Sequence, residues 1–180
     1  MDKRITFKKL KFLTALPIMQ DVFNVISNER DRLSRWFWWC SENITPTKTQ
    51  LIIFVLLYIA ETKRRKLIHK FNPKKCLYDE QFIIMVDGKF GGMIGLDCID
   101  DATKDAEVWY FVSKENEGSG IASTSVQYIT DYALNNNIKH LHANICLLNE
   151  RSINLAQKNG FEFKENRYGD IVTYEKSLAR

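Results

Sequence analysis

The sequence has no hydrophobic run long enough to cross a membrane. Its longest apolar run, residues 51–60, has ten residues, whereas a membrane-spanning helix needs about 20. The first seven residues contain no apolar segment followed by a small-residue cleavage site, so we expect no signal peptide. Together these absences favour a cytoplasmic protein with no membrane partner.

The four cysteines, at positions 40, 76, 98 and 146, lie far apart, and no CxxC or Cys/His cluster occurs. We therefore expect no metal and no disulfide framework, and free thiols fit a reducing compartment. An excess of one charge is also absent. The formal net charge of +4 arises from 26 basic and 22 acidic residues spread along the chain, which does not favour a nucleic-acid partner.

The chain also lacks internal repeats, low-complexity segments and long linkers, so we expect one domain over residues 1–180. Asp87-Gly88 stands between two apolar runs and predicts a hairpin with a type I′ turn. The order of periodic segments predicts the α/β (α+β) class, with a mixed sheet flanked by helices. The expected strands are residues 5–10, 81–86, 90–98, 106–112, 139–147, 162–165 and 170–176, and the expected helices are residues 16–29, 45–66, 121–134 and 150–158.

Residues 51–60 are hydrophobic on all sides of the expected second helix. Such a helix is buried on more than one side. The burial is due either to core packing or to contact with a second copy in a homodimer.

The most informative pattern lies in residues 108–123, where a strand ends and Gly118-x-Gly120-x-Ala122 opens a helix. Two glycines let the backbone approach a ligand closely. The amides of a helix N-terminus, with the helix dipole behind them, form an anion site suited to pyrophosphate. The alternative is a helix start whose glycines serve the turn alone. A Rossmann dinucleotide site fits poorly, because Ser123 stands where its third glycine belongs.

Three segments in order resemble the GNAT superfamily of N-acetyltransferases, and within it the enzymes that acetylate the N-terminal serine or alanine of ribosomal proteins. Residues 117–122 resemble the acetyl-CoA motif [QR]-x-x-G-x-[GA]. Residues 106–112 resemble the fourth strand of that family, and residues 149–161 resemble its N-x-x-S…K-x-G-F segment. The resemblance implies the GNAT fold, with a mostly antiparallel sheet of about seven strands and about four helices.

The resemblance also implies a set of roles around acetyl-CoA, with CoA as product and no metal. Backbone groups near the end of the fourth strand pair with the pantetheine arm, the following turn holds the pyrophosphate, and the later segment touches the pantetheine and outer parts. The implied cofactor-binding residues are Phe111, Val112, Ser113, Gly118, Ser119, Gly120, Ile121, Ala122, Ser123, Asn149, Asn154 and Lys158.

Two features depart from the family pattern. Position 117 is Glu where the family has Gln or Arg, and Glu115 adds a second carboxylate near the expected pyrophosphate. The segment after Phe161 is shorter than in the ribosomal-protein-serine enzymes, and an acidic residue considered as their base has no clear counterpart here.

Acetyl transfer to an amine needs a polarised carbonyl, a proton acceptor for the amine and a proton for the leaving thiolate. The resemblance assigns the first task to the amide of Val112 and the second to Glu107, which is alternatively a strand carboxylate with a structural partner. Ser152 is placed near the thioester sulfur as the proton donor, with Tyr110 and Tyr168 as alternatives. The three histidines lie outside the motifs, and Cys146 is either near the acetyl group or a small buried hydrophobe.

The acceptor is either the N-terminal amine of a protein, including a ribosomal one, or a small amine such as a polyamine, an antibiotic or an amino acid. A third alternative is a non-catalytic acyl-CoA-binding module. The aromatic residues 36–39 either join the core or line the acceptor groove. Residues 63–75 form the densest basic stretch, which either steers an acidic acceptor or is a solvated helix end.

Overall fold

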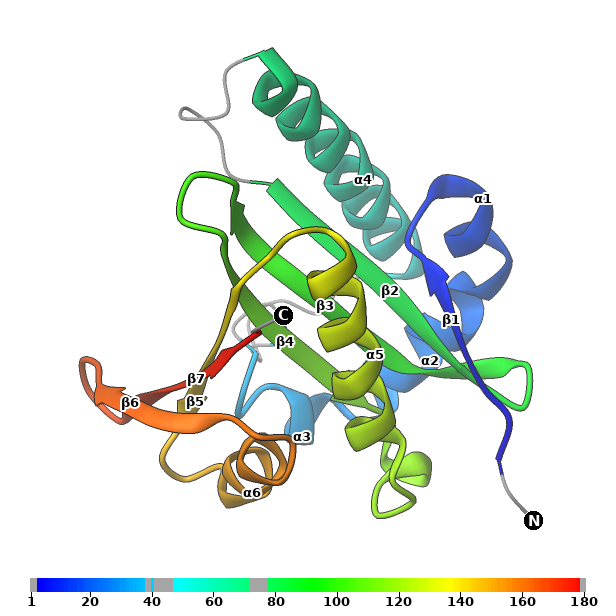
Figure 1. Cartoon of the computed structure of the whole chain (residues 1–180). Coiled ribbons are helices and arrows are strands. Elements are labelled where there is room, and N and C mark those ends of the chain that lie inside the picture. Colours follow the sequence, from blue (N-terminus) through cyan, green and yellow to red (C-terminus); the bar gives the residue numbers. More distant parts are fainter. Residues whose placement is uncertain (1–2, 38–39, 41–46, 72–77, 179–180) are drawn as a thin grey trace.

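The computed structural model describes residues 3–37, 40, 47–71 and 78–178 (Figure 1). The helices and strands, in chain order, are β1 (Ile5–Lys9), α1 (Phe12–Ala15), η1 (Leu16–Ile18), α2 (Met19–Asn28), α3 (Arg30–Leu33), α4 (Lys48–Phe71), β2 (Tyr78–Val86), β3 (Lys89–Asp100), β4 (Asp105–Val112), η3 (Lys114–Asn116), α5 (Ile121–Asn135), β5 (His140–Cys146), α6 (Glu150–Lys158), β6 (Glu162–Asn166) and β7 (Ile171–Ser177).

The strands form one seven-stranded sheet in the order β1-β2-β3-β4-β5-β7-β6. Neighbouring strands are antiparallel except β4 and β5, which are parallel. The predicted mixed, mostly antiparallel sheet is therefore confirmed. At the hairpin between β2 and β3, Asp87 has φ 50° and Gly88 has φ 82°, the two positive values that a type I′ turn requires.

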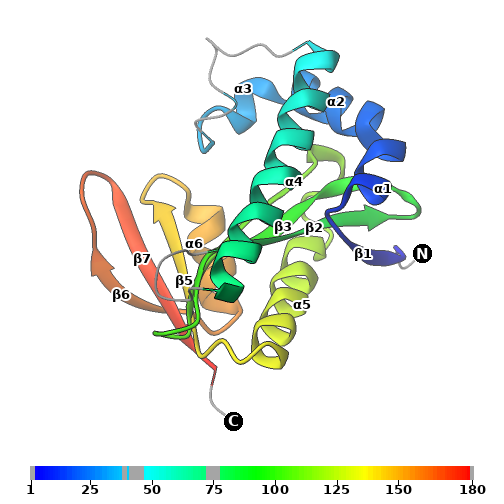
Figure 2. The ribbon, with the colours of Figure 1, turned by 90° about the horizontal axis from the view of Figure 1, so that it is seen from above.

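Helices cover both faces of the sheet, with α4 on one side of β2 and β3 and α5 on the other (Figure 2). The alternation of side chains along each strand divides the core in two. Ile84, Ile94 and Val108 pack with α5 in one cluster. Ile83 and Phe111 pack with α1, α2 and α4 in the other.

The first expected helix, residues 16–29, is broken in the structure, and this corrects the prediction. The range is divided between the 3₁₀ turn η1, which contains Pro17, and α2, and the short helix α1 precedes it. Proline removes a backbone donor and is tolerated at the first position of a helix rather than inside one, so the chain starts a new turn there.

Within the single chain, the described side chains of α4 are buried on one side only, so core packing does not provide the burial on more than one side that its apolar run predicts. Ile59 is 7% exposed and belongs to the core, whereas Ile53 is 49% and Leu57 65% exposed. The sheet and α2 pack against its buried side, and its exposed side has no covering element among the described residues. The homodimer alternative stays a prediction. None of the described helices is long and apolar enough to cross a membrane.

The described part of the basic stretch is docked by ion pairs. Arg65 Nη1 lies 3.3 Å from Asp79 Oδ2, and Lys66 contacts Glu80, both acids of β2. Arg64 pairs with Glu61 on the same helix. The side chain of His69 and residues 72–75, the rest of the stretch, lie outside the described part, as do Trp38 and Trp39. Arg65 and Lys66 therefore hold α4 against β2, in addition to any role toward an acceptor.

Candidate active site

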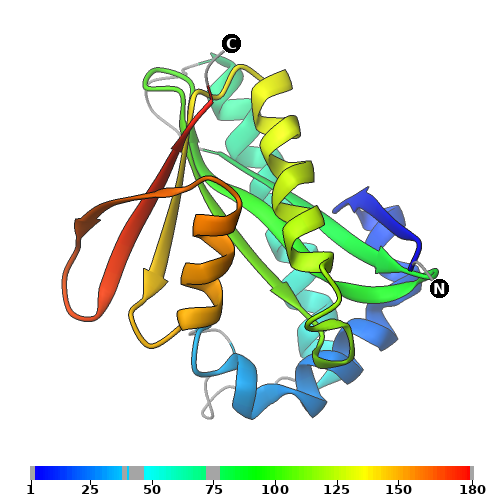
Figure 3. The same cartoon turned by 60° about the horizontal axis from the view of Figure 1, so that its bottom comes forward.

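The parallel strands β4 and β5 pair for only three residues and then diverge. The pairs are Asp105 with His140, Ala106 with Leu141 and Glu107 with His142, and no further β4–β5 pair occurs among the described residues. Figure 3 shows the two strands separating toward their carboxyl ends. The β4 backbone beyond Glu107 therefore has one edge without a strand partner, which another extended chain could use.

The hydrogen-bond pattern of β4 decides which backbone groups face this divergence. The Ser113 N–H donates to the Gly91 carbonyl at 2.8 Å, and the Ser113 carbonyl accepts from Asn116 N–H at 2.9 Å. Backbone N–H and C=O groups point alternately to the two sides of a strand in an antiparallel pair. Those of Phe111 therefore also face β3, while those of Tyr110 and Val112 face the divergence. Of the predicted residues Phe111, Val112 and Ser113, Val112 alone presents its amide and carbonyl there.

The turn after β4 has the conformation that its glycines predict. Gly118 has φ 71° and Gly120 has φ 79°, values that glycine adopts without strain. Gly120 is the N-cap of α5, whose 15 residues begin with Ile121. The first amides of a helix lack intrahelical acceptors, so residues 118–123 direct N–H groups and the positive end of the α5 dipole to one place.

Glu117 precedes this turn and is held by two arginines. Its Oε1 lies 2.8 Å from Arg32 Nη1 and its Oε2 lies 2.8 Å from Arg151 Nη1. Arg32 also donates from Nη2 to the Val112 carbonyl at 3.0 Å and contacts Glu29. The carboxylate that departs from the family pattern is therefore electrically balanced in this structure.

A hydroxyl pair links β4 to α6 across the divergence. The Tyr110 hydroxyl donates to Ser152 Oγ at 3.0 Å, and burial raises the pKa of Tyr110 although this hydrogen bond opposes the rise. Asn149 caps α6, accepting the Ser152 N–H at 3.2 Å. Asn154 and Lys158 lie one turn apart on the exposed side of α6. Ser123 Oγ bonds to Asn159 at 3.1 Å, which connects the start of α5 to the end of α6.

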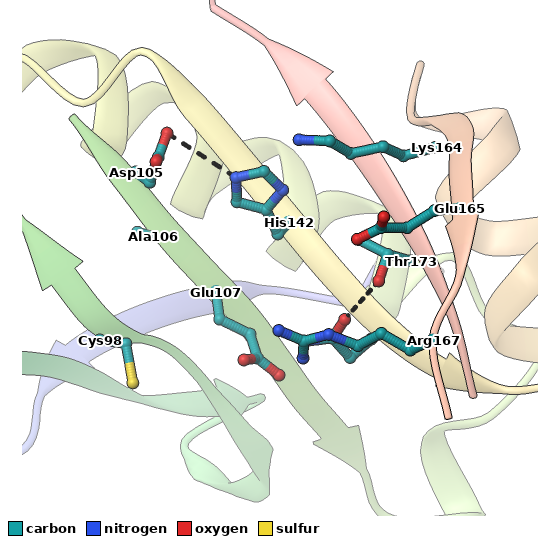
Figure 4. A pocket seen from close by; sticks show the side chains of 10 residues that line it. Cys98, Asp105, Ala106, Glu107, His142, Lys164, Glu165, Arg167 and Thr173 are labelled. Carbon is teal, nitrogen blue, oxygen red and sulfur yellow. Dashed lines mark hydrogen bonds and ion pairs between the residues drawn. The ribbon is translucent and has the colours of Figure 1, made fainter. Parts of the chain in front are cut away.

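Glu107 lies on the opposite face of the sheet, in a pocket of about 310 Å³ over β4, β5 and β7. Figure 4 shows its carboxylate and the Arg167 guanidinium on facing sides of this pocket. Neither makes an ion pair with another described residue. The lining residues are Cys98, Asp105, Ala106, Glu107, His142, Asn144, Lys164, Glu165, Arg167 and Thr173.

A second carboxyl group lies beside Glu107. Asp97 of β3 is its cross-strand partner, so the two side chains project from neighbouring positions of one face. Burial, and next the Asp79 carboxylate, raise the pKa of Asp97 to about 6, while the Trp109 indole N–H, 2.9 Å from Asp97 Oδ1, opposes the rise. Asp97 is not one of the residues that line the pocket, but it places a second carboxyl group beside Glu107.

Sequence reasoning missed Arg32, Arg151, Asp97, His142 and Arg167. Glu117 is 85 residues from Arg32, and no local spacing connects such residues. His142 lies outside the sequence motifs, yet it lines the pocket, 3.7 Å from Asp105 and 3.4 Å from Glu175. Its position opposite Glu107 depends on the parallel pairing of β4 and β5. The alternative acid Tyr168 is highly exposed.

The family model of the acetyltransferase (GNAT) domain matches residues 20–162. The chain therefore belongs to this family, and the resemblance inferred from its motifs is confirmed. Over 111 residues the chain is 27% identical to the ribosomal-protein-serine acetyltransferase of Escherichia coli (strain K12). This match covers 56% of the chain and 62% of that protein, so the chain spans less than two thirds of its curated relative.

Solved structures show the same fold over almost the whole chain. The microcin C7 self immunity acetyltransferase MccE, in complex with acetyl-CoA and AMP, has a TM-score of 0.75 at 17% identity and covers 99% of this chain and 94% of its own. The spermidine N-acetyltransferase of Vibrio cholerae, in complex with CoA and spermine, has a TM-score of 0.65 at 19% identity, covering 96% and 95%. At these identities the likeness concerns the fold.

Proposed function

We propose that this chain is an acyl-CoA-dependent N-acetyltransferase that transfers acetyl from acetyl-CoA to a primary amine and releases CoA. The observation that carries the proposal is the divergence of β4 and β5, with a helix N-terminus at its open end and Glu107 where the pairing stops. The amides of residues 118–123 suit a pyrophosphate, and the edge of β4 without a strand partner suits the amide-bearing pantetheine arm. The MccE and Vibrio structures, which contain acetyl-CoA and CoA, support this ligand.

The bound cofactor supplies a thioester, and the residues of this chain position the amine and move protons. The Tyr110 and Val112 amides both face the divergence. At about 3.3 Å per residue, Tyr110 lies roughly 10 Å and Val112 roughly 16 Å along the strand from Glu107. We therefore assign polarisation of the thioester carbonyl to the Tyr110 N–H in place of the Val112 N–H expected from the resemblance.

The proposed proton acceptor, Glu107, and the proposed proton donors, Ser152 and Tyr110, lie on opposite faces of the sheet. The amine nitrogen forms a bond to the carbonyl carbon as the carbon–sulfur bond breaks, and the amine proton passes to Glu107, through water where the separation requires it. Ser152 donates a proton to the leaving sulfur and recovers one from Tyr110, whose hydroxyl already donates to it. No covalent enzyme intermediate is needed.

We propose further that the acceptor is the N-terminal amine of a protein, including a ribosomal one. The pocket places Asp105 on the same strand as Glu107, where an ammonium would bind, and Lys164, Glu165 and Arg167 on its far side, where Lys164 is paired with Glu175. A polyamine carries positive charge along its length and would be repelled by the Arg167 guanidinium, which makes no ion pair with another described residue. The match to the Escherichia coli enzyme also supports a protein acceptor.

The experiment below also tests two alternative functions. The likeness to a spermidine N-acetyltransferase favours a small amine, and the carboxylate of Glu117 beside the anion site favours an acyl-CoA-binding module without turnover. Cytoplasmic location, a single domain and homodimer formation stay predictions.

The test is thiol release from acetyl-CoA with three acceptors: an acidic peptide with a free N-terminus, the same peptide with a formylated N-terminus, and spermidine. Turnover of the free peptide alone is the expected result. Turnover of spermidine alone would overturn the protein acceptor, and turnover of the blocked peptide would indicate lysine acetylation. Binding of acetyl-CoA without turnover of any amine would indicate the binding module.

A further inference from the structure

The two oxygens of Glu117 hold arginines from two different helices. Arg32 belongs to α3 and Arg151 to α6, and each places one guanidinium nitrogen 2.8 Å from a different oxygen. Glu117 also directly precedes Gly118, the first residue of the anion-binding turn. Two cations suited to phosphate therefore lie beside the proposed pyrophosphate site, and a carboxylate of the chain itself occupies them.

Arg32 is the more firmly held of the two. Its Nη2 donates to the Val112 carbonyl at 3.0 Å, and its partner Glu29 accepts the Lys114 N–H at 2.9 Å. Its side chain is 28% exposed, and its Nε is the one buried side-chain polar atom without a hydrogen-bond partner among the described residues. Arg32 thus stands at the edge of β4 with a donor left to satisfy.

Arg151 is held weakly. Its side chain is 86% exposed, and exposed ion pairs contribute little because water and salt screen them. Guanidinium groups bind carboxylates and phosphates through the same donor geometry. A phosphate arriving at the turn would therefore exchange readily with the Glu117 carboxylate, and the two anions would repel each other if both stayed close.

We propose that Glu117 is an internal counter-ion, which holds Arg32 and Arg151 when the cofactor is absent and gives them up to the phosphates of acyl-CoA when it binds. The inference rests on the proposed function and names the residues that set its phosphate affinity. Glu117 competes with the phosphates, so its carboxylate lowers the affinity for acyl-CoA and for the CoA product.

The test is calorimetry with acetyl-CoA on the full chain, comparing Glu117→Gln with Glu115→Gln. Glu115 lies two residues earlier, is exposed and has no ion pair with another described residue, so it matches the change in charge without the arginines. We expect Glu117→Gln to tighten binding roughly three- to tenfold, as for loss of one competing anion near the surface, and Glu115→Gln to change it less than twofold. Arg151→Gln should weaken binding several-fold.

A second acetyl donor, S-acetylpantetheine, lacks the pyrophosphate and tests whether the pyrophosphate causes the change in affinity. Its affinity should be the same for the original chain, Glu117→Gln and Arg151→Gln. Weaker or unchanged acetyl-CoA binding by Glu117→Gln, or equal tightening by both glutamate variants, would overturn the counter-ion role. Failure of the original chain to bind acetyl-CoA at all would instead refute the proposed function, so the two failures are distinguishable.

Discussion

Replacing Asp97 by Asn should stabilise the fold at pH 8 and leave its stability nearly unchanged at pH 4. Asp97 lies between Asp79 and Glu107 in a half-buried position, and burial raises its pKa from 3.8 to about 6. The Trp109 indole reaches Asp97 over Gly95, where a Cβ would lie 2.7 Å from the indole nitrogen. An Asn side chain keeps an oxygen that can accept this hydrogen bond and removes the charge.

The direction and size of this change in stability follow from proton linkage. Because the folded state binds the Asp97 proton more tightly than the unfolded state, stability falls as pH rises from about 4 to about 6. Above pH 6 the stability lost through ionisation of Asp97 has reached its full value. The rise in the pKa of Asp97 from 3.8 to about 6 corresponds to about 3 kcal/mol of unfolding free energy. This is an upper limit for the stability gained by Asn at pH 8. For a chain of this size it amounts to a rise in Tm of roughly 6–12 °C.

The assay is thermal or urea unfolding of both forms at pH 4 and pH 8. Asp170→Asn serves as the control, because Asp170 is exposed and its replacement should change stability by less than about 0.5 kcal/mol at either pH. A gain of equal size at both pH values would show that the charge of Asp97 is not the cause. A loss of stability at pH 8 would refute the assignment of Asp97 as a destabilising buried carboxylate.

Three further predictions concern the reaction. Glu107→Gln should lower kcat by roughly 10²–10⁴-fold with little change in the acetyl-CoA Kd, whereas Glu165→Gln in the same pocket should retain kcat; full activity of Glu107→Gln excludes a base role. Gly120→Val should abolish calorimetric acetyl-CoA binding in a folded protein, because the turn holds Gly120 at φ 79° and β-branched residues resist positive φ; unchanged affinity contradicts the anion site. Ser152→Ala and Tyr110→Phe should each lower kcat less than Glu107→Gln, because water can replace a hydroxyl donor, and the double variant should lose little more than either single one. Additive losses would show that the two hydroxyls do not act in one path.

Much of the fold and the anion-binding turn of the site could be predicted from the sequence, because these features depend on near neighbours in the chain. The apolar runs of β2 and β3, the Asp87-Gly88 turn and the glycines before α5 are features of residues close together in the chain. The anion-binding turn is local in the same sense, since its amides belong to consecutive residues. The extent of α6, residues 150–158, also agrees with the prediction.

The rest depended on which strands pair and where the pairing stops, which no local pattern specifies. Helix α4 looked apolar on every side, but how much of it is buried depends on which elements pack against it, and within this chain the sheet and α2 cover one side. Glu117 looked unfavourable beside a pyrophosphate until folding brought Arg32 to it from 85 residues away. The meeting of Asp97 with Glu107 likewise follows from the β3–β4 register. Charges and carboxyl groups interact through space, so their roles are decided by tertiary contacts, whereas turns and periodic segments are decided by the backbone that connects them.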